Sequence, residues 1–202
     1  MYPILDTLTL QARGLGPTEA AEALIEAGCR LLQFRHKGPF TRAVFAEAAA
    51  VAGLCRAAGA LFIVNDRADI AAMLGAGLHL GQDDLGPRDA RKVVPPGTII
   101  GLSTHNEAQM REAADEPVDY VAIGPIFVTG SKENPDPALG IDELRRIRHL
   151  TARPLVAIGG ITEENAASVL SAGADSVALI GGLFTTQCST AQVREQARRF
   201  LA

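Results

Sequence analysis

The chain has 202 residues, of which 48% are hydrophobic and only 4% aromatic, and its formal net charge is −4. This length suits one large hydrophobic core, so we expect a single domain over residues 1–202. An acidic chain with few aromatic residues lacks the broad basic surface that nucleic acids require, and no stretch reaches the ~20 apolar residues of a membrane span, so we expect neither partner.

Eight short apolar runs rich in β-branched residues predict strands that are buried on both faces. In chain order they cover residues 2–5, 31–34, 61–64, 77–80, 98–101, 120–123, 155–158 and 177–180. Alanine-rich segments with apolar residues at helical spacing alternate with them, and they predict helices over 18–27, 43–58, 107–114, 141–150, 163–172 and 190–201. Several helices of the chain are expected to end at a left-handed glycine, namely Gly28, Gly59, Gly77 and Gly173.

Regular alternation of strand and helix is typical of two folds, the closed (β/α)8 barrel (TIM barrel) and the doubly wound open sheet. Polar motifs follow six of the runs in this chain. In a closed barrel the loops after the strands converge at one end, so scattered motifs can build one site. We therefore favour an α/β fold of the (β/α)8 type with a composite site at the C-terminal ends of its strands.

The second run leads into two cations, Arg35 and Lys37. Side chains two residues apart leave an extended strand on the same side, as does Gln33, so the cations can bind one anionic group. A solvated basic turn is the alternative.

Two carboxylates follow neighbouring runs, Asp66 after the third and Asp84 after the fourth. In a barrel these strand ends are adjacent, and two carboxylates beside two cations suit Mg²⁺ bound to a polyphosphate. The alternative for Asp66 is a helix cap, since a helix is expected to begin near Arg67.

The last two runs are each followed by a glycine pair, Gly159-Gly160 and Gly181-Gly182. Glycines at these positions let backbone N–H groups approach a phosphate, although tight turns also use them. Lys132 is a further cation in a long connection, where most lysines are simply solvated. His79 and His105 lie in or just after strands, where packed histidines are common, and no residue shows the setting of a nucleophile.

The chain resembles the thiamine-phosphate synthase family along nearly its whole length. The resemblance rests on residues 33–37 (QFRHK), 65–67 (NDR), 79–84 (HLGQDD), 100–105 (IGLSTH), 124–127 (GPIF) and 157–161 (AIGGI). It implies an enzyme that joins 4-amino-2-methyl-5-hydroxymethylpyrimidine diphosphate to a thiazole phosphate, releasing pyrophosphate by Mg²⁺-assisted dissociative displacement.

The resemblance also assigns roles to individual residues, with Asp66 and Asp84 as the Mg²⁺ ligands. It implies that the pyrimidine diphosphate is held by Gln33, Arg35, Lys37, Asn65, Ser103 and Lys132. His36 and His79 are further candidate substrate-binding residues. The thiazole phosphate would face Thr129, Ser131, Gly160, Ile180 and Gly181. Among these, the residues expected to assist the reaction directly are Arg35, Lys37, Ser103 and Lys132.

Departures from the family pattern lie on the thiazole side. Val128 replaces the usual proline, Ser131 replaces threonine, and Gly181-Gly182 replaces a Ser-Ala pair. Loss of one side-chain donor lowers the expected affinity for thiazole phosphate by only ~1 kcal/mol.

Three other functions remain open from the sequence. A thiazole tautomerase resembles the chain around His105 but characteristically lacks the aspartate pair. A phosphosugar isomerase needs a placed acid/base pair, and a non-catalytic regulator would need no diphosphate or metal residues.

The three cysteines, Cys29, Cys55 and Cys188, form no CxxC pair and predict neither a disulfide framework nor a zinc site. Because the N-terminus shows no signal-peptide pattern, we expect a cytoplasmic protein. Its expected partners are small-molecule substrates, with a homo-oligomer also compatible with the sequence.

Overall fold

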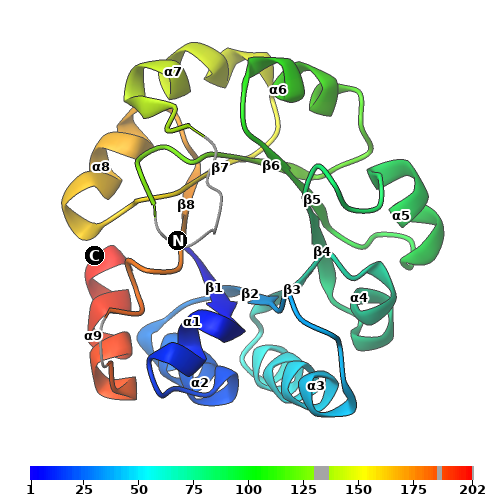
Figure 1. Ribbon diagram of the computed structural model, residues 1–202, viewed down its shortest axis with the longest axis vertical. Coiled ribbons are helices and arrows are strands. Elements are labelled where there is room, and N and C mark those ends of the chain that lie inside the picture. The colour runs from blue at the N-terminus through cyan, green and yellow to red at the C-terminus, as the bar shows by residue number, and fades with distance from the viewer. Residues whose placement is uncertain (130–136, 186–187, 202) are drawn as a thin grey trace.

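The computed structural model describes residues 1–129, 137–185 and 188–201, and its centre is a closed parallel barrel of eight strands (Figure 1). Each strand pairs with the next along the chain, and the last pairs with the first. The strands are β1 (Tyr2–Asp6), β2 (Leu31–Arg35), β3 (Leu61–Asn65), β4 (Gly77–Leu80), β5 (Ile100–Thr104), β6 (Tyr120–Ile123), β7 (Leu155–Ile158) and β8 (Ser176–Leu179). The predicted (β/α)8 barrel is confirmed, and the open sheet is excluded.

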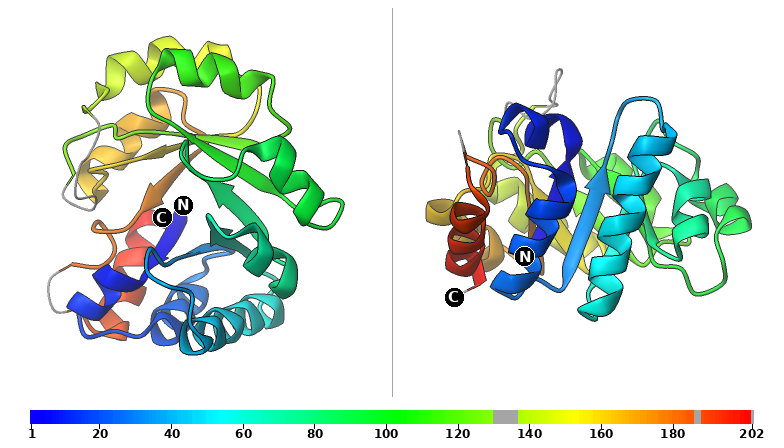
Figure 2. Two further views of the ribbon diagram at one scale, coloured as in Figure 1. Left: turned by 45° about the vertical axis from the view of Figure 1, so that its right-hand side comes forward. Right: turned by 90° about the horizontal axis from the view of Figure 1, so that it is seen from below.

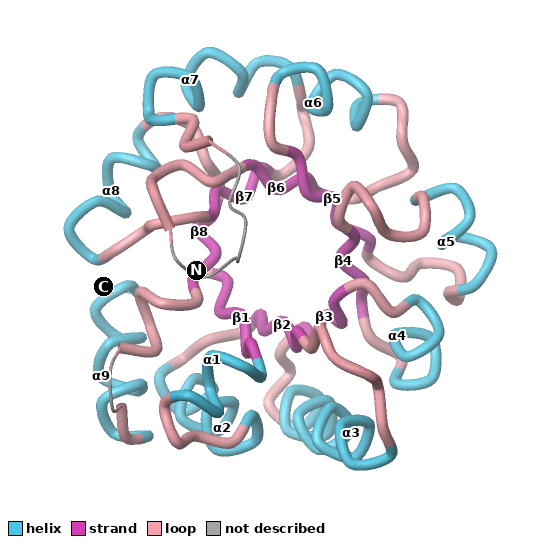
Figure 3. Tube along the Cα trace, viewed as in Figure 1, coloured by secondary structure: helices cyan, strands magenta, loops and turns pink. Residues whose placement is uncertain are grey.

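Helices form a ring outside the strands, as the trace coloured by secondary structure shows (Figure 3). The described helices are α1 (Thr7–Ala12), α2 (Pro17–Ala27), α3 (Arg42–Ala57), α4 (Ala68–Leu74), α5 (Pro87–Val93), α6 (Glu107–Ala114), α7 (Gly140–Ile147), α8 (Glu163–Ser171) and α9 (Thr190–Leu201). A short 3₁₀ turn, Arg148–Leu150, follows α7. The last helix packs beside α2 (Figure 2). Arg194 of α9 pairs with Glu26 of α2.

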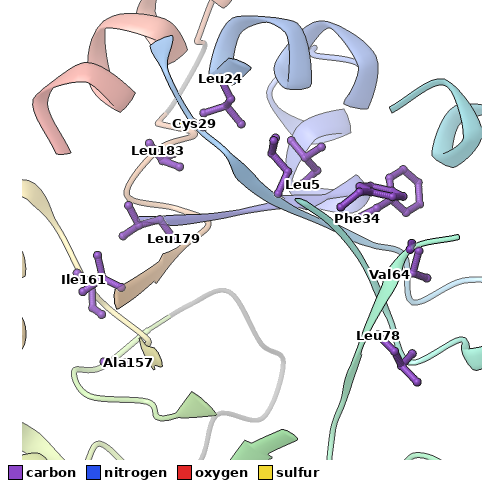
Figure 4. Close-up of a cluster of buried hydrophobic side chains, with 14 of the residues drawn as sticks. Leu5, Leu24, Cys29, Phe34, Val64, Leu78, Ala157, Ile161, Leu179 and Leu183 are labelled. Atoms are coloured by element: carbon purple, nitrogen blue, oxygen red, sulfur yellow. The ribbon is translucent and has the colours of Figure 1, made fainter. Parts of the chain in front are cut away.

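Two apolar layers hold the barrel together. The outer layer lies between the strands and the helices, where Leu5 of β1 and Leu24 of α2 are fully buried (Figure 4). The inner layer fills the barrel and includes Tyr2, Ile63 and Tyr120. Because side chains alternate along each strand, one set of positions packs on the helices and the other lines the barrel interior.

The cysteines lie in the core. All three are free thiols and buried. Burial raises the pKa of Cys29 and Cys55 to about 11, so both stay protonated at neutral pH. Among the described helices, none combines the length and apolarity that a bilayer crossing needs.

Most predicted boundaries fall within one or two residues of those observed, and the exceptions have physical reasons. The fifth strand is Ile100–Thr104 rather than 98–101, because its pairing with β6 continues to Thr104, whose buried hydroxyl donates to the Ala122 carbonyl at 2.8 Å. A prediction based on apolar residues stops before the polar Ser103 and Thr104 and therefore ends this strand too early.

The predicted helix end at Gly77 is wrong. Gly75 takes the left-handed conformation after α4, while Gly77 is the first residue of β4. Gly28 does end α2 as predicted. The short α1 is not visible in the hydrophobic pattern, because it depends on its cap: the Asp6 carboxylate accepts a hydrogen bond from the Thr9 N–H at 2.9 Å.

Candidate active site

A cavity of about 520 Å³ opens at the C-terminal ends of the strands, and residues from every strand or the loop after it line the cavity. The structure places in its wall most of the residues singled out from the sequence. These are Gln33, Arg35, Lys37, Asn65, Asp66, His79, Asp84, Ser103, Thr129, Gly160, Ile180 and Gly181. Ser131 and Lys132 lie outside the described residues. His36 is not in the wall, and its Nδ1 lies 2.8 Å from the Thr7 hydroxyl.

The two carboxylates Asp66 and Asp84 meet at one side of the cavity. Asp66 takes a left-handed backbone conformation, with φ 64°, directly after β3. Such a conformation is uncommon for a residue other than glycine and is concentrated at functional sites. The Asp66 N–H donates to the His79 carbonyl at 2.8 Å, which fixes this turn against β4. Asp84 is held by the Gly81 N–H, which donates to it at 2.7 Å.

The Asp66 carboxylate is under electrostatic strain even though Lys37 Nζ lies 2.6 Å from it. Burial and the neighbouring Asp84 raise the pKa of Asp66 to about 6, although Lys37 opposes this shift. An ionised pair of carboxylates at this position therefore destabilises the folded chain near neutral pH.

This strain predicts a pH dependence of stability in the metal-free protein. The folded-state pKa of Asp66 lies above its unfolded value, so its ionisation lowers the free energy of unfolding as pH rises through about 6, and protonation removes the penalty at lower pH. We expect wild type to lose stability relative to Asp66→Asn between about pH 5 and about pH 7.5, as measured by chemical denaturation of both proteins. An identical difference at the two pH values would contradict this.

The carboxylate pair fits Mg²⁺. The described residues contain no group of three or more His, Cys, Asp or Glu side chains suited to a metal, so Asp66 and Asp84 supply two ligands at most. Mg²⁺ is commonly bound through one or two carboxylates, with water and substrate phosphate oxygens completing its octahedron. A divalent cation would also relieve the repulsion that raises the pKa of Asp66.

A second cation in the cavity wall, Arg35, pairs with Asp6 at the end of β1. Asp6 is 4% exposed and serves at the same time as the cap of α1. It was not singled out in the sequence, where it follows the first apolar run much as Asp66 follows the third. The β1–β2 register places Asp6 directly beside Arg35, so the pair fixes the guanidinium at the cavity wall.

Asn65 supplies an unsatisfied donor. It is the last residue of β3 and is 7% exposed, yet its Nδ2 has no hydrogen-bond partner among the described residues. A buried amide donor without a partner costs about 1–3 kcal/mol. Because Asn65 lines the cavity, a ligand acceptor would recover this cost.

The opposite side of the cavity is built from backbone after β7 and β8. Gly160 has φ 63°, and a Cβ atom there would lie 2.6 Å from the Val128 carbonyl oxygen. Within the described ranges, the N–H groups of Gly160, Gly181 and Gly182 donate to no backbone carbonyl. Free N–H groups at this position of a barrel are suited to bind a phosphate.

The fold and site together define a (β/α)8 barrel with one cavity, whose wall carries two cations and a carboxylate pair on one side and backbone N–H groups of the β7 and β8 loops on the other. Residues 2–183 match the family described as thiamine monophosphate synthase. The chain therefore belongs to this family.

Individual relatives agree with this assignment. A thiamine-phosphate synthase of Koribacter versatilis is 48% identical over 185 residues, covering 91% of this chain and 84% of that protein. One from Methanoculleus marisnigri is 44% identical over 191 residues, covering 94% and 90%. The solved structure of thiamine phosphate pyrophosphorylase from Pyrococcus furiosus superposes with a TM-score of 0.82 at 29% identity, covering 100% of this chain and 96% of that one.

Proposed function

We propose that this chain is a transferase that joins an aminopyrimidine-methyl diphosphate to a thiazole phosphate, forming thiamine phosphate and pyrophosphate. One observation carries the proposal: the Asp66–Asp84 pair and two cations face, across one cavity, the free N–H groups of the β7 and β8 loops. Strands β3 and β7 lie on opposite sides of the ring (Figure 3), so the two phosphorylated substrates would bind against opposite walls of the cavity.

Arg35 and Lys37 would hold the diphosphate of the pyrimidine substrate. In the structure each is paired with a carboxylate, Asp6 and Asp66 respectively. Arg35 can bind oxygens of the diphosphate through its free N–H groups while Asp6 holds its orientation. Lys37 is 46% exposed and would exchange its contact with Asp66 for one with the diphosphate. When bound by Asp66 and Asp84, Mg²⁺ would add positive charge beside the departing pyrophosphate.

The reaction would then need little covalent chemistry from the protein. Loss of pyrophosphate leaves a pyrimidine-methyl cation, which the thiazole nitrogen captures. The cavity supports this by fixing the two substrates face to face and excluding water. Asn65 and Ser103 would donate hydrogen bonds on the pyrimidine side, and Lys132 and Ser131 are proposed to add a cation and a hydroxyl.

Formation of product from both substrates tests the proposal. Purified protein with Mg²⁺ should release thiamine phosphate and pyrophosphate in equal amounts, and omission of either substrate should abolish both. Isomerisation of a thiazole phosphate without any need for the pyrimidine would instead indicate a tautomerase, with His105, which also lines the cavity, as the residue to study.

Gly160→Ala is expected to weaken thiazole phosphate binding selectively. Gly160 has a left-handed backbone, which strains any residue with a side chain. The added methyl group would also lie 2.6 Å from Val128 and 2.7 Å from Phe127, so the loop must shift. We expect KM for thiazole phosphate to rise about 10- to 100-fold, since strain and displaced donors cost about 1–3 kcal/mol. Steady-state kinetics with each substrate varied in turn measures this.

Gly59→Ala is the matched control for that variant. Gly59 has φ 64°, yet nothing lies within 4 Å of a Cβ built there, and it is not in the cavity wall. It should reproduce the loss of stability from the backbone conformation but leave both KM values unchanged. Equal effects of the two variants on KM would contradict the role of Gly160.

We also infer that the enzyme acts in the cytoplasm, where free thiols such as Cys29 and Cys55 persist. Neither a nucleic acid nor a membrane is needed for the proposed reaction, and a homo-oligomer is compatible with it.

A further inference from the structure

A chain of hydrogen bonds crosses the inside of the barrel beneath the cavity. Gln33 Nε2 donates to the Tyr2 hydroxyl at 2.8 Å, and that hydroxyl lies 2.9 Å from the Tyr120 hydroxyl. His79 Nδ1 lies 2.8 Å from the Tyr120 hydroxyl, and His79 Nε2 lies 2.9 Å from Ser103 Oγ. Both ends of the chain, Gln33 and Ser103, line the cavity, while the two tyrosines between them do not.

The direction of these hydrogen bonds follows from the Gln33 amide. Because the amide donates to the Tyr2 oxygen, the single Tyr2 hydrogen is left for Tyr120. The Tyr120 hydrogen then goes to His79 Nδ1, which must be unprotonated to accept it. A neutral imidazole of this kind carries its hydrogen on Nε2 and donates it to Ser103.

Each end of this hydrogen-bond chain thereby has a defined group for a ligand. One of the two Gln33 amide hydrogens is given to Tyr2, which fixes the amide so that its Oε1 can accept a hydrogen bond from a ligand. Ser103 accepts from His79, so its own hydroxyl hydrogen is left to donate. An aminopyrimidine offers an N–H donor and ring-nitrogen acceptors, which complement this pair of groups.

Packing inside the barrel holds these hydrogen-bonded side chains in place. Tyr2 is 1% exposed and Tyr120 8%. A Cβ atom on Gly101 would lie 2.0 Å from Tyr120 Cζ, so the absence of a side chain at Gly101 makes room for the ring. The His79 ring stacks on Tyr120 with centroids 5.5 Å apart. Burial raises the pKa of both tyrosines well above the usual value, so both hydroxyls keep the hydrogens on which the chain depends.

We propose that Tyr2, Tyr120 and His79 are positioning residues that set the direction of hydrogen bonding across the barrel, so that Gln33 presents an acceptor and Ser103 a donor to the aminopyrimidine. The identity of the ligand rests on the proposed function. The direction of the hydrogen bonds does not rest on the proposed function, because it is a property of the protein without substrate.

The tautomer of His79 tests the direction directly. In protein labelled with ¹⁵N-histidine, Nδ1 of His79 should give the signal of an unprotonated nitrogen and Nε2 that of a protonated one. Only four histidines are present, and His79→Gln identifies the signals. A proton on Nδ1 would reverse the chain and overturn the proposal, whether or not the protein makes thiamine phosphate.

Kinetics of Tyr2→Phe and Tyr120→Phe test the positioning role. Each variant removes one hydroxyl from the chain and keeps the ring. We expect kcat/KM for the pyrimidine diphosphate to fall about tenfold or more, since a misdirected buried polar group weakens binding, while KM for thiazole phosphate stays within about twofold.

Val51→Ala controls for loss of stability, because Val51 is fully buried on α3 and does not line the cavity. The positioning role would be wrong if Val51→Ala lowered kcat/KM for the pyrimidine diphosphate as much as the tyrosine variants do. It would also be wrong if the tyrosine variants changed both KM values equally. Should a tyrosine variant fail to fold, the His79 tautomer in the wild type still decides the direction.

Discussion

Asp66→Asn should lower the proposed synthase activity at least about a hundredfold while making the metal-free protein more stable near neutral pH. Asparagine keeps the shape of the side chain and tolerates the left-handed backbone at this position. It removes the charge that burial and Asp84 disfavour, and with it one of the two proposed Mg²⁺ ligands. Kinetics and denaturation of the same preparation measure both effects.

Asp69→Asn is the control for a general effect of removing a carboxylate. Asp69 pairs with Arg67 on the surface, is 54% exposed at its side chain and is not in the cavity wall. We expect its activity within about twofold of wild type, as for a surface ion pair. Loss of stability in Asp66→Asn would contradict the strain at this carboxylate, and activity near that of Asp69→Asn would contradict its proposed role as a metal ligand.

Arg35→Gln is expected to lower both the stability and the activity of the protein. Adding Asp6→Asn should separate the effect on stability from the effect on activity. Removing the guanidinium leaves the buried Asp6 carboxylate without its cation, at a cost of about 2–3 kcal/mol because Arg35 is 16% exposed and the site is partly open to water. The diphosphate also loses one cation, so we expect kcat/KM to fall about a hundredfold.

The double variant Asp6→Asn with Arg35→Gln should recover most of the stability and none of the activity. With both charges removed, no uncompensated carboxylate remains in the wall. Denaturant titration and kinetics of the two single variants and the double variant complete the cycle. Recovery of activity together with stability would mean that Arg35 acts only through its pairing with Asp6.

The sequence predicted the fold well, because its main signals are local. Apolar runs, helical periodicity and strand–helix alternation depend on neighbouring residues, and closure follows from eight such units. The same topology explains why residues from the ends of many strands line one cavity.

Contacts between distant residues were beyond the sequence pattern. The Asp6–Arg35 pair depends on the β1–β2 register, and Asp6 alone looks like an ordinary helix cap. Tyr2 and Tyr120 look like apolar strand residues, and only closure of the barrel brings their hydroxyl groups together. The left-handed turn at Asp66, with its N–H bound to β4, is likewise a product of packing.

The two cations that the structure describes in the cavity wall, Arg35 and Lys37, are each paired with a carboxylate of the protein. Arg35 is held by a buried partner, whereas Lys37 is held by a carboxylate that is also a proposed metal ligand. Binding of Mg²⁺ at Asp66 would therefore release Lys37 toward the diphosphate. Metal and diphosphate binding are expected to favour each other for this reason.

The most direct test of this active site is the rate of thiamine phosphate formation from the two substrates, measured against Mg²⁺ concentration for wild type and Asp84→Asn. We expect a saturable dependence on Mg²⁺ in wild type, no product after chelation, and a shift of the dependence to about 10- to 100-fold higher Mg²⁺ in the variant. Product formation that continues without a divalent cation, or an identical Mg²⁺ dependence in both proteins, would contradict the assignment of the carboxylate pair.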